Sequence, residues 1–387
     1  MGGIIYLYLY MKYFFIAGEA SGDLHGSSLI EELKKLDSTC EIRFFGGDLM
    51  RAASGVKPIK HIREMAFMGF WAVLKNLSTI LKNMRVCKKA ILDFQPDVVV
   101  MIDYPGFNLR MAKFVRQKTG IPVYYYISPS VWAWKSHRVK QIKRDVTQML
   151  AIIPFEKEFY ASHQYDVKYV GNPSVDSVNE HLDKTEETSY FKKKYFLSDK
   201  PIIALLPGSR KQEIAACLPK MIAAARKFPE YQIVISGVNS VHTAFYHEFM
   251  DGNSYPVIKH HPYQLIFHAD LAVVNSGTAT LETALIGTPQ VVVYHVMLGR
   301  LAYWAKEVVI KTKFISLVNI LAEKQVVKEL FAHLFTTDNL IDEMTRILRD
   351  DQYRNEMIAS YKVLRDKLGE PGTARRAATC IYQHKKV

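Results

Sequence analysis

The sequence predicts an α/β protein with two facing Rossmann-like domains and an interdomain cleft. Short apolar runs alternate with amphipathic stretches along the chain, a pattern typical of parallel sheets covered by helices. This pattern stops at a polar, charge-rich stretch, residues 180–200, and then begins again. The 387 residues, 49% of them hydrophobic, are also enough for two hydrophobic cores.

The first domain is expected over residues 1–172. Its strands are predicted at 12–17, 41–45, 97–102, 122–127, 148–153 and 167–170, and its helices at 24–36, 70–94, 106–118, 138–144 and 155–163. Residues 1–10 are interpreted as an upstream extension and not as a signal peptide, because no basic segment begins them and a glycine turn follows the first strand. Elsewhere no apolar run reaches 18 residues, so no transmembrane helix is predicted.

The second domain is expected over residues 200–350, after a linker at 173–199. Its strands are predicted at 201–206, 231–236, 256–258, 270–275 and 290–295, and its helices at 211–227, 240–250, 262–268 and 278–286. From residue 298 the chain is predicted to be mostly helical. Because open parallel sheets bind ligands at the carboxyl ends of their strands, we expect the functional residues directly after the strands.

The charge of the chain favours an acidic partner. The net charge is +13, and residues 1–172 carry 24 Lys and Arg against 15 Asp and Glu. Nothing in the sequence resembles a nucleic-acid-binding module, so we expect a phosphorylated substrate or anionic lipid and no nucleic acid. The four cysteines are scattered, which argues against a zinc site or disulfide framework and favours a reducing compartment.

A turn that joins a predicted strand to a helix, LPGSR at 206–210, is the sharpest local motif. The backbone N–H groups of a helix N-terminus attract anions. Gly208 allows a close approach, Ser209 can donate a hydrogen bond, and Arg210 can bind a phosphate with two donors. The alternative is an ordinary strand–helix turn in which Ser209 only caps the helix.

A second turn of this kind, SGTATLE at 276–282, follows strand 270–275. Ser276, Gly277 and Thr278 can hold the other side of a diphosphate, and the Glu282 carboxylate can accept from both hydroxyls of a ribose. The alternative is that Glu282 only supports the helix N-terminus. Two such turns in one domain predict a bound nucleotide diphosphate.

No metal or cofactor is predicted. Many metal-dependent sugar-nucleotide transferases use two aspartates separated by one residue, and no such pair occurs here. His260, His261 and His268 lie close together in the sequence, and we assign them structural or solvent-exposed roles. Backbone N–H groups and Arg210 would then stabilise the leaving diphosphate in place of Mg²⁺.

In the first domain, Asp103 ends the apolar strand 97–102 and is the candidate catalytic base. The alternative is a helix or turn cap. Gly18, Glu19 and Ser21 lie in the turn after the first strand, where Glu19 and Asp23 are the rival bases. That turn does not match G-x-G-x-x-G, which argues against a dehydrogenase.

Two aromatic segments are candidates for contact with an acceptor or a membrane. The loop 128–135 offers Ser128, Ser130 and Trp132, which could line an acceptor pocket or pack between domains. Residues 66–85 have apolar side chains at helical spacing, and lysines at 75, 82 and, just beyond this segment, 89 recur every seven residues on another face. The apolar candidates for contact with anionic membrane or acyl chains are Phe67, Met68, Phe70 and Trp71, with the lysines at the rim of the patch. The alternative is a core helix with a solvated basic face.

These motifs together resemble one family, the lipid-A-disaccharide synthases. The matching stretches are AGEASGD (17–23), MGF (68–70), PDVVVMIDYPGFN (96–108), YYISPSVWAWK (125–135), PFEKEFY (154–160), VGNP (170–173), LLPGSRKQEI (205–214), SGTATLE (276–282), KTKFISLVNIL (311–321) and VVKEL (326–330). They run in order along nearly the whole chain after residue 11. One departure is Val318, where the family often has Pro.

The resemblance implies a GT-B fold whose last helix, at about 365–387, packs back on the first domain. It implies an inverting hexosyltransferase that moves 2,3-diacylglucosamine from UDP-2,3-diacylglucosamine to the lipid monosaccharide 1-phosphate, at the cytoplasmic side of the inner membrane as a peripheral protein. The products are a β-1,6 lipid A disaccharide 1-phosphate and UDP. By the same resemblance, Asp103 matches an essential aspartate, Arg210 and Glu282 match nucleotide-site residues, and Asn319 matches a functional asparagine.

Other functions remain open from the sequence. The nearest rivals are other GT-B enzymes, a lipid-linked N-acetylglucosaminyltransferase or a UDP-GlcNAc epimerase. An epimerase would act on a soluble sugar nucleotide and would not need the apolar segment near 66–74. A non-catalytic nucleotide-binding membrane protein would bind UDP without turnover and would tolerate Asp103→Asn.

Overall fold

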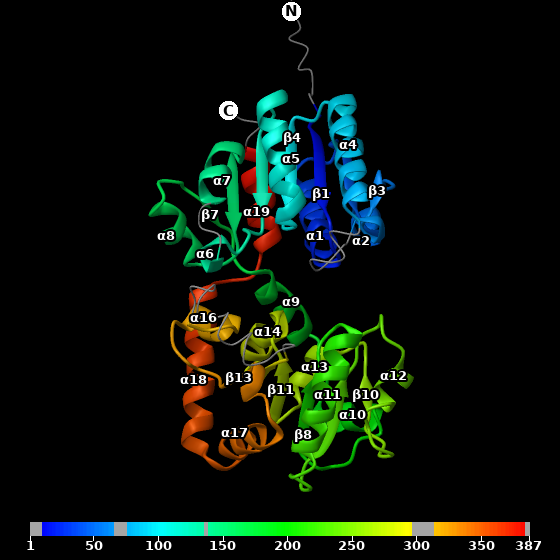
Figure 1. Ribbon diagram of the computed structural model, residues 1–387, viewed down its shortest axis with the longest axis vertical. Coiled ribbons are helices and arrows are strands. Elements are labelled where there is room, and N and C mark those ends of the chain that lie inside the picture. Colours follow the sequence, from blue (N-terminus) through cyan, green and yellow to red (C-terminus); the bar gives the residue numbers. More distant parts are fainter. Residues whose placement is uncertain (1–9, 66–75, 135–137, 296–312, 384–387) are drawn as a thin grey trace, which may run out of the picture. The chain divides into compact units, whose positions relative to one another are not determined.

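A computed structural model describes residues 10–65, 76–134, 138–295 and 313–383. The chain divides into two compact units: unit 1 holds residues 1–173 and 372–387, and unit 2 holds residues 174–371. Each unit contains one parallel β-sheet flanked by helices (Figure 1). The α/β class predicted from the alternating apolar runs is confirmed in both units.

The sheet of unit 1 has the strand order β3-β2-β1-β4-β5-β6-β7 in the described residues, with all neighbours parallel. Its strands are β1 (Lys12–Ala17), β2 (Glu41–Gly46), β3 (Lys60–His61), β4 (Val98–Ile102), β5 (Val123–Tyr126), β6 (Gln148–Ala151) and β7 (Lys168–Tyr169). Every residue of β4 is buried. A strand this apolar suits a parallel sheet that helices cover on both faces.

The helices of unit 1 form two apolar layers with the sheet between them. They are α1 (Ala20–Leu36), α2 (Asp48–Ser54), α4 (Leu77–Phe94), α5 (Pro105–Lys118), α6 (Val131–Trp134), α7 (Val139–Asp145), α8 (Glu156–Ala161) and α19 (Thr373–Tyr382). Because side chains alternate along a strand, Phe14 packs in the layer of α4, α5 and α7, and Phe15 packs in the layer of α1 and α19. The C-terminal helix α19 therefore completes the core of unit 1 (Figure 1).

The sheet of unit 2 has the order β10-β9-β8-β11-β12-β13 in the described residues, again all parallel. Its strands are β8 (Ile202–Leu206), β9 (Gln232–Ser236), β10 (Val257–Ile258), β11 (Leu271–Asn275), β12 (Gln290–Tyr294) and β13 (Glu329–Phe331). The helices are α9 (Pro173–Leu182), α10 (Thr188–Lys194), α11 (Lys211–Ala225), α12 (Thr243–His247), α13 (Pro262–Phe267), α14 (Thr278–Ile286), α16 (Leu317–Ala322), α17 (Thr337–Arg349) and α18 (Asp351–Leu368).

Both sheets reverse their strand order at one point, between β1 and β4 in unit 1 and between β8 and β11 in unit 2. Doubly wound sheets bind ligands outside the carboxyl ends of the strands at this reversal. The turns after β1 and β4 contain Gly18 and Asp103, and the turns after β8 and β11 contain Gly208 and Gly277. Each unit thus places two of the motifs found in the sequence side by side.

The structure corrects the expected linker. Residues 173–199 contain the helices α9 and α10, and from residue 174 they belong to unit 2. The reason is Phe191, which is fully buried in the same apolar cluster as Ile202 and Leu265. Val175 and Val178 of α9 are buried as well. Polar and charged neighbours surround these few apolar side chains in the sequence, so the pattern resembles a linker.

The C-terminal boundaries also differ from the expected ones. Unit 2 extends to residue 371 instead of 350, because α18 buries Tyr361, Leu364 and Leu368. The helix of unit 1 begins at Thr373 and not near 365. Two glycines with positive φ, Gly369 and Gly372, separate it from α18. The short strand β13 lies in the part of the chain that was expected to be mostly helical.

Candidate functional site

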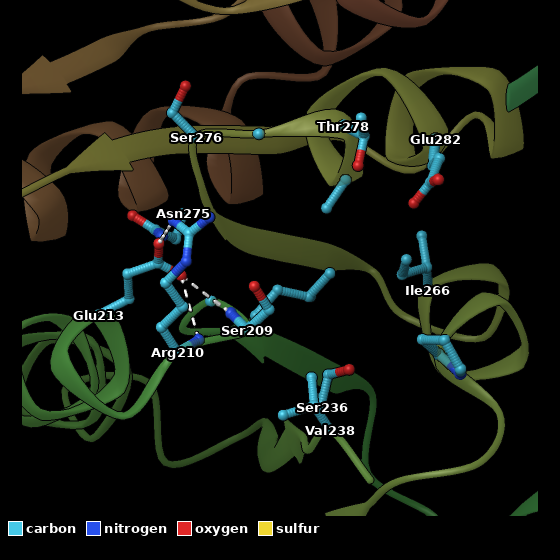
Figure 2. Close-up of a pocket in the computed structure, with 15 residues that line it drawn as sticks. Ser209, Arg210, Glu213, Ser236, Val238, Ile266, Asn275, Ser276, Thr278 and Glu282 are labelled. Carbon is cyan, nitrogen blue, oxygen red and sulfur yellow. Dashed lines mark hydrogen bonds and ion pairs between the residues drawn. The ribbon is translucent and has the colours of Figure 1, made fainter. Parts of the chain in front are cut away.

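Unit 2 contains a pocket of about 320 Å³ at its strand reversal, within the range of small-ligand sites. Figure 2 shows Arg210 and Glu213 on one side of this pocket and Glu282 on the other. The lining residues are Leu206, Gly208, Ser209, Arg210, Glu213, Ser236, Val238, Pro262, Ile266, Asn275, Ser276, Gly277, Thr278, Ala279 and Glu282. The structure therefore brings together every residue that the sequence assigned to the nucleotide.

The turn after β8 is built around Gly208 and Glu213. Gly208 has a φ of 117°, and a Cβ atom there would lie 2.6 Å from Glu213 Oε2 and 2.8 Å from Asn275 Nδ2. Glu213 Oε2 accepts from the backbone N–H groups of Ser209 and Arg210, at 3.0 and 3.3 Å. The turn thus binds a carboxylate of its own chain through backbone donors, as an anion-binding helix N-terminus does.

Arg210 is held at the mouth of the pocket. Its Nη1 donates to Glu213 Oε1 at 2.8 Å, while 60% of its side chain remains exposed. Glu213 was not assigned a role from the sequence. The signal that could have found it is its place three residues after the helix cap, where a glutamate commonly completes a capping box.

The turn after β11 is open toward the pocket. Helix α14 begins at Thr278, and an added Cβ at its cap, Gly277, would meet nothing within 4 Å. Ser276 N donates to Val293 O at 2.8 Å, and the Thr280 hydroxyl donates to Gly277 O at 2.8 Å. These bonds fix the turn, and Gly277 and Thr278 are left exposed at the N-terminus of a nine-residue helix.

Glu282 lies one turn into α14 and faces the pocket (Figure 2). Burial raises the pKa of its carboxyl, while a hydrogen bond with the Tyr263 hydroxyl and the nearby His181 act to lower it. The Tyr263 and His181 rings pack with centroids 4.5 Å apart. Tyr263 comes from α13, and no sequence motif marked it.

In unit 1, Asp103 lies in the turn between β4 and α5. Its backbone N–H donates to Tyr126 O at 3.0 Å, and the side chain is partly buried. Burial raises the pKa of the Asp103 carboxyl to about 6, and the negative charge of Glu19 adds to this rise. A carboxyl with this pKa is mostly ionised at pH 7 and is a stronger base than an ordinary aspartate.

The rival bases in the turn after β1 have different surroundings. Asp23 is buried, and its carboxylate accepts from the backbone N–H groups of Gly47, Leu49 and Met50 at 2.7, 3.1 and 3.1 Å. It therefore caps α2. Glu19 is half-buried beside Asp103.

Gly18 and Ser21 flank these carboxylates. A Cβ at Gly18 would lie 2.2 Å from the ring of Tyr104, so only glycine lets this ring cover the turn. Ser21 is exposed in the first turn of α1.

Comparison with known proteins identifies the family. A model of the lipid-A-disaccharide synthetase family matches residues 13–382. The lipid-A-disaccharide synthase of Syntrophus aciditrophicus is 39% identical over 94% of this chain and 95% of its own length. That of Myxococcus xanthus is 36% identical over 95% of this chain and 96% of its own length. This chain belongs to the lipid-A-disaccharide synthetase family.

Solved structures of an epimerase and a glycosyltransferase show which fold this chain has. The UDP-GlcNAc 2-epimerase of Neisseria meningitidis matches with a TM-score of 0.59 and 14% identity, over 97% of this chain and 100% of that chain. The calicheamicin glycosyltransferase CalG4 matches with a TM-score of 0.57 and 16% identity, over 98% and 99% of the two chains. The two parallel-sheet α/β domains therefore have the GT-B fold, as the resemblance implied.

The aromatic loop that begins at Ser128 is held in place by a hydrogen bond to a buried glutamate. The Trp132 indole N–H donates to Glu156 Oε1 at 3.2 Å, and the Ser128 hydroxyl lies 2.9 Å from that of Tyr160. Ser128 is buried and Ser130 is exposed. Glu156 has no exposed surface, and this burial raises the pKa of its carboxyl to about 8. Glu156 lies in the PFEKEFY motif (154–160), but the sequence did not predict its role.

Asn319 is fully buried in unit 2, where its amide bonds to neighbouring chain segments. Its Nδ2 donates to Val327 O and Glu329 Oε1, at 2.8 and 2.9 Å. Its Oδ1 accepts from the backbone N–H groups of Val326 and Val327, at 2.7 and 2.9 Å. Glu329 in turn accepts from Ile315 N and Ser316 N. This arrangement ties the start of α16 to β13.

The four residues predicted to contact a membrane or acyl chains, Phe67, Met68, Phe70 and Trp71, lie outside the described residues. No group of three or more His, Cys, Asp or Glu side chains in the described ranges is arranged to hold a metal ion. Among the helices described, none combines the length and hydropathy needed to cross a membrane. Of the histidines at 260, 261 and 268, His268 is buried against the Phe191 ring, with the ring centroids 4.4 Å apart.

Proposed function

We propose that the protein transfers 2,3-diacylglucosamine from UDP-2,3-diacylglucosamine to 2,3-diacylglucosamine 1-phosphate, with inversion, and releases UDP. The observation that carries this proposal is the pocket at the strand reversal of unit 2, in a chain that matches the lipid-A-disaccharide synthetase family over residues 13–382. Two helix N-termini, an arginine and a partly buried glutamate meet there. This set of groups suits a nucleotide diphosphate.

In the proposed complex, the diphosphate lies between the turns at Gly208 and Gly277. Arg210 binds its oxygens and stabilises the charge that develops on the departing UDP. Glu282 accepts hydrogen bonds from the ribose hydroxyls, and Tyr263 holds it in place. Because Glu213 already fixes the Arg210 guanidinium at the pocket, little side-chain entropy remains to be lost on binding.

In unit 1, Asp103 is the proposed base. It removes the proton of the attacking acceptor hydroxyl while the bond between the donor sugar and its phosphate breaks. Gly18, Glu19, Ser21, Ser128, Ser130 and Trp132 are proposed to line the acceptor side. We propose that Asn319 acts by positioning, since its amide groups already bond to Val326, Val327 and Glu329.

The transfer is expected to proceed without a metal ion or a cofactor, because Arg210 and the two helix N-termini carry the charge of the diphosphate. In a reaction with both lipid substrates, UDP release should require the acceptor and should continue in EDTA. UDP release without the acceptor would argue against a transferase. Loss of most activity in EDTA, with recovery in Mg²⁺, would contradict the metal-free mechanism.

The protein is proposed to act in the cytoplasm, on the anionic inner-membrane surface where its lipid substrates reside. Helix α4 supports this, because Leu77, Leu81 and Leu92 are 45–50% exposed beside the exposed Lys82 and Arg85. Leu81→Ser should weaken binding to vesicles with anionic lipid and leave the melting temperature unchanged. Binding should also weaken as salt screens the basic side chains. Equal binding of Leu81→Ser and the unmodified protein would contradict this membrane contact.

A further inference from the structure

The turn that carries Asp103 has an unusual backbone. Asp103 and Tyr104 are consecutive non-glycine residues in the left-handed region, with φ of 43° and 50°. L-residues adopt this conformation rarely, and a pair in succession persists only where surrounding contacts impose it. Such strain concentrates at functional sites, so the contacts that impose it here bear directly on the position of the Asp103 carboxyl.

Two side chains converge on the carbonyl oxygen of Asp103. The Tyr125 hydroxyl donates to this oxygen at 2.6 Å, and Asn108 Nδ2 donates at 2.7 Å. On the other side of the residue, Asp103 N donates to Tyr126 O at 3.0 Å. The peptide groups on both sides of the Asp103 Cα are therefore fixed, and these groups determine the direction in which its side chain leaves the turn.

The two donors are themselves rigidly placed. Asn108 is fully buried on α5, and its Nδ2 also lies 3.2 Å from Ile102 O and 3.4 Å from Ile16 O. It therefore joins β1, β4 and the turn. Tyr125 is fully buried on β5, beside β4. Burial holds the pKa of the Tyr125 hydroxyl well above its usual range, so it remains a donor at any working pH.

We propose that Tyr125 and Asn108 are positioning residues that hold the left-handed turn and so aim the Asp103 carboxyl at the acceptor hydroxyl. This inference rests on the proposed role of Asp103 as base. Neither side chain needs to touch a substrate, because both act on the Asp103 carbonyl. A geometric error near 1 Å at a reacting group costs on the order of 10²-fold in rate, so loosening the turn should slow catalysis without weakening donor binding.

The test compares two buried tyrosines of unit 1. Tyr125→Phe removes one donor to the Asp103 carbonyl. Tyr165→Phe is the matched control, because the Tyr165 hydroxyl also donates to a backbone carbonyl, Val146 O at 3.2 Å, and its side chain is also buried. Tyr125→Phe should lower kcat roughly tenfold or more and leave the KM for the UDP-sugar unchanged. Tyr165→Phe should change neither by more than about twofold.

The pH dependence of kcat/KM provides a second measurement, which a purely structural role of Tyr125 would leave unchanged. The titratable groups that act on Asp103 are Glu19 and Tyr125, and the backbone N–H of Tyr104 bonds to its carboxyl. Tyr160 and Arg138 in turn act on Tyr125. If the loosened turn lets the Asp103 carboxyl reach water, the acid limb of kcat/KM should shift to lower pH in Tyr125→Phe and stay in place in Tyr165→Phe. An unchanged kcat and acid limb in Tyr125→Phe, or the same changes in both variants, would overturn the proposal.

A third experiment distinguishes failure of this inference from failure of the proposed function. The ¹³C resonance of the Asp103 carboxyl, assigned with Asp103→Asn, reports its titration without any transfer reaction. In Tyr125→Phe its apparent pKa should fall, and in Tyr165→Phe it should stay unchanged. A shift confined to Tyr125→Phe supports the positioning role even if transfer is never observed, whereas equal titration in all three proteins overturns it.

Discussion

Asp103→Asn is expected to lower kcat by at least about 10²-fold, because a positioned base contributes typically 10²–10⁴-fold to proton transfer. Asparagine keeps the size of the side chain and its hydrogen-bonding capacity but has no basic oxygen. Donor binding should change little, since the nucleotide pocket lies wholly in unit 2. Steady-state kinetics that give kcat and KM separately, together with UDP titration, check this expectation.

The pH dependence of kcat/KM provides a second test of Asp103 as the base. The pKa of Asp103 is raised to about 6, so kcat/KM should rise from acid pH through about 6 as the carboxyl loses its proton. A raised pKa also means that folding favours the protonated form, so its stabilising contribution is lost as pH rises through about 6. Asp103→Asn should therefore not lower the melting temperature at pH 7.

The rival carboxylates provide the control for this assignment. Asp23→Asn should lower the melting temperature, because its carboxylate accepts from three backbone N–H groups at the start of α2. Glu19→Gln should shift the acid limb to lower pH, because it removes a negative charge beside Asp103. Near-normal turnover in Asp103→Asn, with activity abolished in Glu19→Gln, would place the base in the turn after β1.

Arg210→Ala is expected to weaken UDP binding about tenfold or more. A hydrogen bond to a charged group is worth about 1.5–3 kcal/mol, and the guanidinium faces the pocket from a position that Glu213 fixes. Glu282→Ala should weaken UDP binding to a similar extent, because the ribose hydroxyls would lose their acceptor. Isothermal titration with UDP checks both variants without any lipid substrate.

The matched control for this prediction is Arg349→Ala. Arg349 is also in unit 2, pairs with Glu230, and exposes 61% of its side chain, against 60% for Arg210. It does not line the pocket. UDP affinity should be unchanged in Arg349→Ala. If Arg210→Ala and Glu282→Ala also bind UDP as the unmodified protein does, the nucleotide does not occupy the pocket of unit 2.

The sequence predicted those parts of the site that are contained in one short segment of the chain. A buried strand followed by a glycine turn and a helix has a recognisable pattern, and all residues assigned to the nucleotide from such patterns line one pocket. Asp103 was found in the same way, because it ends the apolar run of β4. The sheets themselves follow from the alternation of apolar and amphipathic stretches.

The sequence did not predict roles that depend on contacts between residues far apart along the chain. Tyr263 reaches Glu282 from another helix, and Tyr125 reaches the Asp103 carbonyl from the next strand of the sheet. Neither contact leaves a spacing pattern. The helices α9 and α10 were not predicted, because only a few buried side chains, Val175, Val178 and Phe191, anchor this charged segment.

The most direct test of the proposed activity is whether transfer depends on the acyl chains of the donor. The protein is incubated with 2,3-diacylglucosamine 1-phosphate and either UDP-2,3-diacylglucosamine or UDP-glucosamine without acyl chains, and the products are identified by mass spectrometry and NMR. The proposed function predicts a β-1,6-linked disaccharide 1-phosphate and an equal amount of UDP from the acylated donor only. Interconversion of a soluble UDP-sugar without a disaccharide, or tight UDP binding without any product, would contradict it.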